Sequence, residues 1–289
     1  MPKNFKSNLQ NRAVGRALAR WRADSGMSLT EVTKHVGWST AKTSMLQNAL
    51  QPIPDHDVLA LALIYGIADD RRRPVLLGAQ RAQAPTQFEL LGGDISACLG
   101  WTYAEIESEA NYTRVVALEV LPPVVRSPEY EAALCRTQAD ALSKQLHRHY
   151  SDADRKQVID HLRNGPTLCM DLIIGESILH RPVGGSLVMA DQLLRLATFS
   201  TLPGVRVQLA PDNNGALAGM APFTAMSFRE VAFDDVVYLD TLHGGTWLES
   251  QSDVQPYTET FAQLASEALP TNDTSDRLIE AAQQHKDAD

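Results

Sequence analysis

The sequence lacks the features that mark several classes of protein. Its 289 residues include only 3 cysteines, Cys98, Cys135 and Cys169, which lie far apart in the chain. Three cysteines cannot all pair, and no Cys or His residues are spaced closely enough to suggest a zinc site. We therefore expect no metal site, and we interpret the cysteines as small buried apolar residues.

Long apolar runs are also missing. The longest are a few residues, far short of the about 20 that a helix needs to cross a bilayer, and residues 1–12 contain no apolar signal core. We expect a cytoplasmic protein without membrane contact. A chain of this length that is 44% hydrophobic and 21% charged is typical of a globular protein with two domains.

Sequence motifs of the common enzyme classes are absent. There is no phosphate-binding P-loop, no dinucleotide-binding glycine motif, no His-Glu-x-x-His and no Gly-x-Ser-x-Gly. The best cluster for acid–base chemistry is Asp171, Glu176, His180 and Arg181, near a predicted strand end. Ion pairs and a loop histidine explain these residues equally well. We expect no enzymatic activity and no cofactor.

The charge is distributed unevenly along the chain. Residues 1–73 carry 11 Lys and Arg against 6 Asp and Glu, whereas the remainder carries 15 against 29. This basic N-terminal segment, called the basic head below, is therefore expected to bind a polyanion. The acidic remainder is expected to keep the chain in solution or to bind another partner.

Local signals in the basic head predict a bundle of short helices. Apolar residues at helical spacing predict a first helix over 9–24, and a further helix is expected over 57–65. Between them, Ser28 and Glu31 form a capping-box pair that opens a short helix, which Gly37 can end in a left-handed conformation. Ser39 can then cap a third helix. Two short helices joined by a glycine turn are typical of a helix-turn-helix.

The run from Ser28 to Asn48 resembles the helix-turn-helix of the XRE or Cro/phage-repressor family. The register rests on the small residue Thr33, the turn residue Gly37 and the core residues Val36 and Leu46. In that family the second helix lies in the major groove of double-stranded DNA. The positions that match its base-facing and phosphate-facing residues are Ser39, Thr40, Ala41, Lys42, Thr43 and Met45.

Two departures from the family pattern concern the second helix. Met45 cannot make the bidentate contact to guanine that an arginine makes, and Ala49 stands where a C-cap glycine is common and must adopt a strained backbone. Lys42 is the only positive residue of this helix. The resemblance therefore implies weak DNA binding, through hydroxyl, methyl and shape contacts, or a domain that has drifted toward protein contacts.

The rest of the chain predicts a larger α+β domain. Residues 69–85 are charged, bounded by proline and poor in pattern, so we place a linker there, although Val75 to Arg81 also suit a last helical turn of the first domain. We place the boundary near residue 80, between a helix-turn-helix domain over 1–80 and a second domain over 86–289. Helical segments alternate irregularly with strands, which favours an α+β fold around one mixed sheet of about five strands. The expected strands are 114–121, 168–175, 205–209, 223–228 and 236–242.

Most of this second domain resembles the C-terminal domain of actinobacterial XRE-family regulators, the Scr-type antitoxin-like and WhiJ-like proteins. The resemblance rests on order and spacing of 128–130, 181–185, Gln192 and 222–223 among others. It implies a domain that senses a ligand or a protein partner, in a family whose genes often neighbour small acidic partner proteins.

Together these features predict a DNA-binding transcription regulator that acts as a homodimer. Its second domain would respond to a small-molecule effector or to a small acidic partner protein. The alternative is an antitoxin-like or developmental protein-interaction module with a vestigial helix-turn-helix, and a hydrolase is a third class. An apolar stripe from Val254 to Ala268 is expected to pack in the core or to support self-association.

Overall fold

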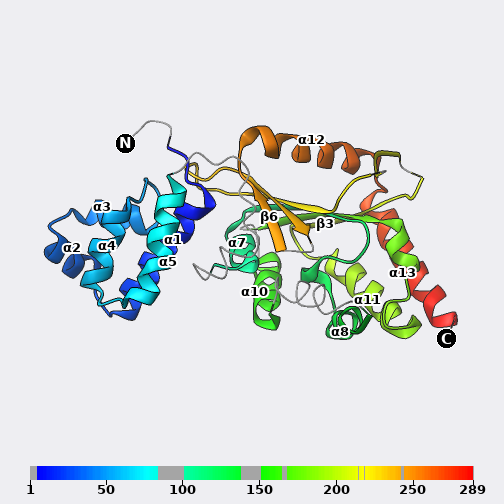
Figure 1. Ribbon diagram of the computed structural model, residues 1–289. Helices are drawn as coiled ribbons and strands as arrows, with labels where there is room; N and C mark the ends of the chain where they lie inside the picture. The colour runs from blue at the N-terminus through cyan, green and yellow to red at the C-terminus, as the bar shows by residue number, and fades with distance from the viewer. Residues whose placement is uncertain are drawn as a thin grey trace. The chain divides into compact units, whose positions relative to one another are not determined.

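The computed structural model describes residues 5–83, 101–137, 151–164, 168–213, 215–217, 219–241 and 244–288. The chain forms two compact units (Figure 1): unit 1 is Met1–Thr102 with Arg229–Asp234, and unit 2 is Tyr103–Phe228 with Asp235–Asp289. Trp101, Thr102 and the segment Arg229–Asp234 thus belong to the first unit, although the sequence boundary assigns them to the second. Within the described ranges, no helix is long and apolar enough to span a membrane.

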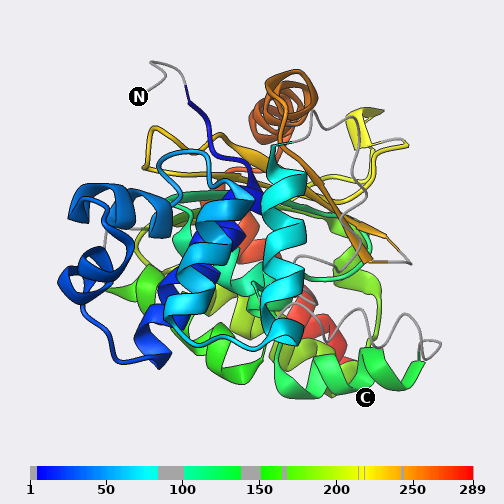
Figure 2. The ribbon, with the colours of Figure 1, turned by 60° about the vertical axis from the view of Figure 1, so that its left-hand side comes forward.

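Unit 1 contains five described helices, and α1 packs beside α5 (Figure 2). Residues 69–82 form a regular helix, which contains the helical turn considered for 75–81, whereas the expectation of a linker beginning at residue 69 is wrong. Pro74 interrupts the pattern in the sequence, but Val75, Gly78 and Ala79 of this helix are buried. Tertiary packing therefore overrides the local cost of the proline. The helices are α1 (Leu9–Asp24), α2 (Leu29–Val36), α3 (Thr40–Gln47), α4 (Asp55–Ile64) and α5 (Asp69–Ala82).

The predicted helix caps of unit 1 are confirmed. The Ser28 hydroxyl accepts a hydrogen bond from the backbone N–H of Glu31, and the Glu31 carboxylate accepts one from the backbone N–H of Ser28 at 2.8 Å. The Ser28 hydroxyl also donates to this carboxylate, and the hydrogen bonds from the hydroxyl and the backbone N–H of Ser28 lower the pKa of Glu31. Gly37 ends α2 with φ of 73°, and the Ser39 hydroxyl caps α3 by accepting from the N–H of Lys42. Local chemistry thus determines both ends of the turn.

The end of α3 packs directly on α1 at Gly15. Ala49 has φ of 52°, the left-handed backbone expected from its replacement of a C-cap glycine, and it is 2% exposed. A Cβ at Gly15 would lie 3.0 Å from the carbonyl oxygen of Leu46 and 3.1 Å from the Cβ of Ala49. The absence of a side chain at Gly15 therefore lets α3 approach α1.

We expect Gly15→Ala to destabilise the protein by about 1–3 kcal/mol because the added methyl group meets backbone atoms that cannot yield freely. In an unobstructed helix the same substitution stabilises by about 0.5–1 kcal/mol, so the sign of the change is diagnostic. Urea unfolding of both proteins measures it. A stabilised variant would show that α3 does not approach α1 this closely.

Unit 2 is built on one mixed sheet of six strands in the order β3-β2-β1-β4-β5-β6. β1, β2 and β3 are parallel, whereas β4 pairs with β1 in the antiparallel sense and β5 and β6 continue antiparallel. The five expected strands are present, and Gly244–Leu248 is a sixth that the sequence analysis missed. The strands are β1 (Tyr112–Ala117), β2 (Cys169–Gly175), β3 (Val205–Ala210), β4 (Phe223–Ser227), β5 (Val236–Thr241) and β6 (Gly244–Leu248).

Helices cover both faces of the sheet (Figures 1 and 2). On one face, α12 (Gln251–Glu267) packs Val254, Phe261 and Leu264 into a core with sheet residues such as Val116 and Val237. The apolar stripe is therefore core, which removes it as a surface for self-association. α7 (Tyr103–Glu109), α8 (Pro128–Thr137), α10 (Asp152–Arg163) and α11 (Ser186–Phe199) lie on the opposite face, and α13 (Thr271–Asp287) packs against α11 and β3.

Short helical turns and two half-buried cysteines complete the description. The turns are Pro123–Val125, Glu176–His180 and Gly215–Leu217. Cys135 and Cys169 form no disulfide bond and are half-buried in the described part of the chain, so they are less buried than the sequence analysis expects. Cys98 lies outside the described residues.

A buried carboxyl group lies on α7. Glu107 is 2% exposed, and the Tyr103 hydroxyl donates a hydrogen bond of 3.4 Å to its Oε1. Removal from water raises the pKa of Glu107 to about 8, although the hydrogen bond from Tyr103 acts in the opposite direction. The folded protein therefore holds a proton on this group at pH values where the unfolded chain has lost it.

We expect the free energy of unfolding to fall as pH rises between about 5 and 8, by up to about 1.4 kcal/mol per pH unit from this group. The sign follows because the native state binds more protons than the unfolded state in that window. Glu107→Gln should flatten the dependence, since the amide stays neutral. Urea unfolding across this range tests it, and an unchanged slope in the variant would contradict a buried, protonated Glu107.

Candidate nucleic-acid interface

The helix-turn-helix presents an exposed surface at the beginning of α3. Ser39, Thr40 and Ala41 are exposed there, and Met45 is half-exposed one turn further on. On α2, Lys34 and His35 are exposed as well. Because Ser39 and Thr40 carry hydroxyl groups and Ala41 and Met45 carry methyl groups, this surface suits the hydroxyl and methyl contacts expected from the sequence.

Thr43 does not belong to that surface. Its side chain is fully buried, at 0% exposure, and its hydroxyl contacts the backbone oxygen of Ser39 at 3.4 Å. The expectation that Thr43 contacts DNA therefore needs correction for this conformation. The helical repeat places this position on the buried face of α3, together with Leu46 and Gln47, whereas the sequence register alone does not reveal which residues of α3 are covered.

Lys42 is held by two neighbours that the sequence analysis did not connect with it. Its Nζ lies 2.9 Å from Asp57 Oδ2 and 3.7 Å from the centroid of the Trp38 ring. Asp57 lies in the first turn of α4 and its side chain is only 6% exposed. The single cation of α3 is thus partly neutralised, because a desolvated carboxylate and an aromatic face both compensate it.

Two arginines of α1 pack on aromatic rings. Arg12 is 3% exposed, and its Cζ lies 5.0 Å from the ring centroid of Trp101 and 4.1 Å from that of Phe233. Arg16 lies over Trp101 at 5.5 Å. These cations pack on aromatic rings within unit 1, which the stripe pattern of the sequence does not show because Phe233 lies more than 200 positions along the chain.

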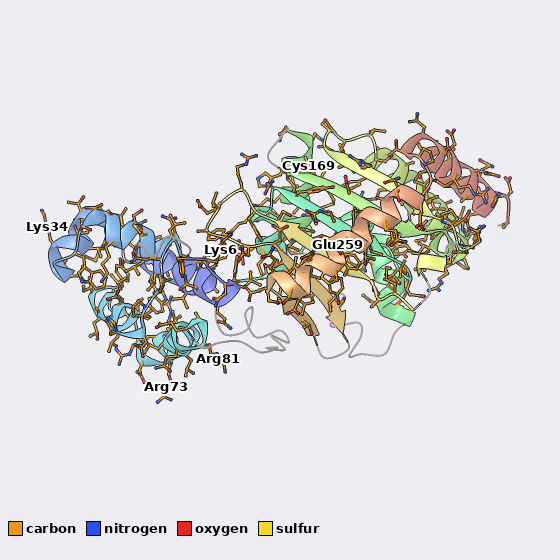
Figure 3. The ribbon with its side chains drawn as sticks, turned by 90° about the horizontal axis from the view of Figure 1, so that it is seen from above. Lys6, Lys34, Arg73, Arg81, Cys169 and Glu259 are labelled. Carbon is orange, nitrogen blue, oxygen red and sulfur yellow. The ribbon has the colours of Figure 1, made fainter. Side chains whose placement is uncertain are left out.

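The remaining cations of unit 1 are dispersed. Arg71 pairs with Asp24 at 3.4 Å and Arg72 with Asp69 at 3.0 Å. Figure 3 shows Lys34 at one end of the helical unit, while Arg73 and Arg81 lie along α5. Only Lys34 and Lys42 therefore contribute positive charge to the surface made by α2 and α3 in the described part of the chain.

A polar network supports the geometry of α3 from behind. Gln47 accepts a hydrogen bond from Arg22 Nε at 2.9 Å and donates one to the Tyr65 hydroxyl at 3.1 Å. Arg22 also donates to the backbone oxygen of Met27, just before α2. The network links α1, α3 and α4, so it holds α3 in position rather than offering a contact to a ligand.

The residues considered for acid–base chemistry are not brought together. Asp171 lies near the start of β2, where it accepts a hydrogen bond from the Tyr112 hydroxyl and pairs with Arg206 at 3.7 Å. Glu176 follows the other end of that strand and pairs with Arg277 at 3.2 Å. His180 is exposed, and Arg181 pairs with Glu119. Separate ion pairs thus account for three of these four residues. Among the described residues, no cluster of His, Cys, Asp or Glu could hold a metal ion.

Comparisons with known proteins follow the division into two units. Residues 13–75 match a family model described as a helix-turn-helix domain. Residues 101–280 match the model described as Domain of unknown function (DUF5753), and the chain belongs to that family. The crystal structure of the clp gene regulator ClgR from C. glutamicum is similar over 27% of this chain and 99% of that chain, with 24% identity and a TM-score of 0.22. The comparison with curated proteins gives no match.

Proposed function

We propose that the protein is a cytoplasmic, DNA-binding transcription regulator that acts as a homodimer, and that unit 2 senses a small-molecule effector or a small acidic partner protein. The observation that carries the proposal is the capped helix-turn-helix with an exposed α3 N-terminus, together with the match of residues 13–75 to a helix-turn-helix domain. The resemblance of unit 2 to the Scr-type antitoxin-like and WhiJ-like regulators supports the sensing role.

Dimer formation would let two copies of α3 reach two half-sites. Exposed leucines in unit 1 support this part of the proposal: Leu59 and Leu63 lie one turn apart on α4 and are 39% and 62% exposed, and Leu77 of α5 is 50% exposed. Solvent-exposed leucines at this spacing form a small apolar surface that a second copy could cover. We also propose that the protein acts by binding and not by catalysis, because the candidate acid–base residues are dispersed.

The few available cations favour an alternative, in which the helix-turn-helix serves protein contacts. Lys42 is tied to Asp57, and Arg12 is buried on Trp101 and Phe233. A repressor-like domain with these features has little electrostatic attraction for a phosphate backbone. The salt dependence of DNA binding separates the two functions, because it counts the phosphates that cations of the protein neutralise.

We expect weak DNA binding with a shallow salt dependence. Lys34 and Lys42 are two cations per subunit, so log K should fall with log salt at a slope of about 2 per subunit, at about 0.9 per phosphate. Gel mobility shifts with the DNA upstream of the protein's own gene, at several salt concentrations, measure this slope. No retarded fragment even at low salt would favour the protein-interaction function.

We expect Asp57→Asn to strengthen DNA binding several-fold and to steepen the salt slope by up to about 0.9 per subunit, because Lys42 loses its carboxylate partner. The matched control is Asp55→Asn, which removes the same charge from the same turn of α4. Asp55 accepts a hydrogen bond from Gln80 and not from Lys42. Equal affinity gains in both variants would indicate a general charge effect and not release of Lys42.

A further inference from the structure

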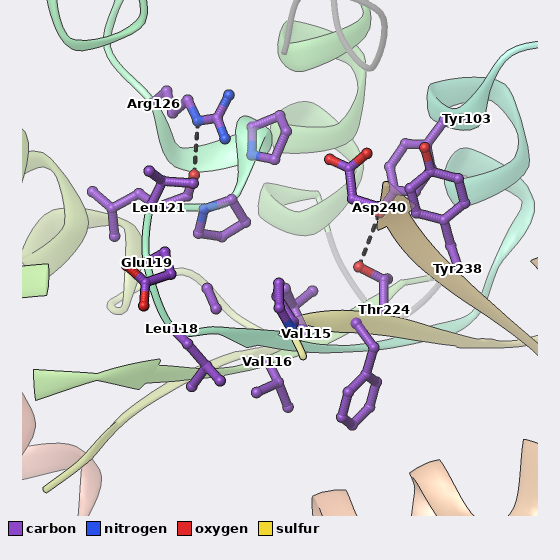
Figure 4. A pocket seen from close by; sticks show the side chains of 16 residues that line it. Tyr103, Val115, Val116, Leu118, Glu119, Leu121, Arg126, Thr224, Tyr238 and Asp240 are labelled. Carbon is purple, nitrogen blue, oxygen red and sulfur yellow. Dashed lines mark hydrogen bonds between the residues drawn. The ribbon is translucent and has the colours of Figure 1, made fainter. Parts of the chain in front are cut away.

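Unit 2 contains a cavity of ≈ 110 Å³ at the carboxyl end of β1. Its lining comes from β1, the following segment through Pro123, and residues of β4 and β5 (Figure 4). At this point the sheet changes direction, because β1 has parallel β2 on one side and antiparallel β4 on the other. Ligands of open sheets commonly bind outside the carboxyl ends of strands where the strand order reverses.

A buried cation lines this cavity. Arg126 is 2% exposed, and its Nε donates a hydrogen bond of 2.7 Å to the backbone oxygen of Leu121. Its Nη1 is buried and has no hydrogen-bond partner among the described residues. Burial lowers the pKa of Arg126, but a guanidinium keeps its charge in proteins. An incompletely satisfied buried cation is costly, so this atom is suited to an anionic ligand group.

The wall across from Arg126 is aromatic and pre-organised (Figure 4). The rings of Tyr103 and Tyr238 meet edge to face at 4.8 Å, and Tyr238 lies 4.7 Å from Trp247. The Tyr103 and Thr224 hydroxyl oxygens are hydrogen-bonded at 3.2 Å. Gly245 on β6 leaves the space that the Tyr238 ring occupies, since a Cβ there would collide with it. The shape of the cavity is thus set without a ligand.

The rest of the lining defines the ligand further. Val115, Leu121 and Pro122 supply apolar surface, which suits a hydrocarbon group. A cavity of 150 Å³ admits benzene, so ≈ 110 Å³ with an open end accommodates roughly four to seven non-hydrogen atoms. Asp240 lines the exposed end together with Glu119, which pairs with Arg181. The negative charge of Asp240 disfavours a second carboxylate on the ligand.

We propose that this cavity binds a short or branched-chain aliphatic monocarboxylate. The carboxylate accepts hydrogen bonds from the Arg126 guanidinium, while the hydrocarbon part packs against Val115, Leu121 and the Tyr238 ring. The inference deepens the proposed sensing role of unit 2 and rests on it for its biological meaning. The site itself is argued from Arg126 and the cavity alone.

Isothermal titration of the full-length protein with isovalerate, in the absence of DNA, tests the proposal. The matched ligand is isovaleramide, which has the same shape without the charge, and succinate tests exclusion of a dicarboxylate. We expect saturable binding of isovalerate and a rise of the thermal midpoint with its concentration. Isovaleramide and succinate should bind at least about tenfold more weakly, since a hydrogen bond to a charged group is involved.

Two variants locate the binding. Arg126→Met should weaken isovalerate binding at least about tenfold, whereas Arg277→Gln, which removes an exposed guanidinium paired with Glu176, should bind as wild type does. Ala117→Leu keeps Arg126 and fills the cavity, and it should also abolish binding. Ala117→Leu therefore tests the binding site even if Arg126→Met does not fold.

The outcomes separate this inference from the proposed function. Equal binding of isovalerate and isovaleramide, retention of binding in both cavity variants, or no binding of isovalerate would each overturn the carboxylate site. Mobility shifts with DNA are a separate measurement. Isovalerate binding without DNA binding would support the carboxylate site and contradict the proposed transcription regulator. DNA binding without isovalerate binding would support the transcription regulator and contradict the carboxylate site.

Discussion

A positive charge that leaves water must be compensated where it lies, and this constraint determines what the basic side chains of the protein can do. Arg12 is compensated by the faces of Trp101 and Phe233, and Lys42 by Asp57 and Trp38. Arg126 differs because it lines a cavity, and its buried Nη1 has no hydrogen-bond partner among the described residues. Arg12 and Lys42 are therefore poorly suited to bind a ligand, whereas Arg126 marks a candidate binding site.

The constraint also explains why net charge is a poor guide to function in this chain. The basic excess of residues 1–73 indicates a polyanion-binding head, but much of it is used inside unit 1. Arg71 and Arg72 pair with carboxylates, and Arg12 packs on aromatic rings. What remains on the α2–α3 surface is Lys34 and a partly neutralised Lys42. An interface of this kind depends on hydroxyl, methyl and shape contacts for DNA recognition.

In unit 2 the topology of the sheet determines where the candidate binding cavity lies. β1 lies at the change from parallel to antiparallel pairing, so the chain that leaves its carboxyl end turns away and leaves a cavity between the sheet and the helices on one face. The aromatic contacts of Tyr103, Tyr238 and Trp247 keep that space from collapsing. Core packing by α12 on the opposite face supports the same strands without entering the cavity.

The sequence by itself determined the features that depend on neighbouring residues. The capping box at Ser28 and Glu31, the left-handed Gly37 and Ala49, and most strands followed from local chemistry and periodicity. Only the tertiary structure decided which side of α3 is buried, and it places Thr43 in the core and not on the exposed surface. It also paired Lys42 with Asp57, extended the first unit with Phe233 and formed β6. These outcomes join residues distant in sequence, and burial and charge compensation depend on such neighbours, which local patterns do not specify.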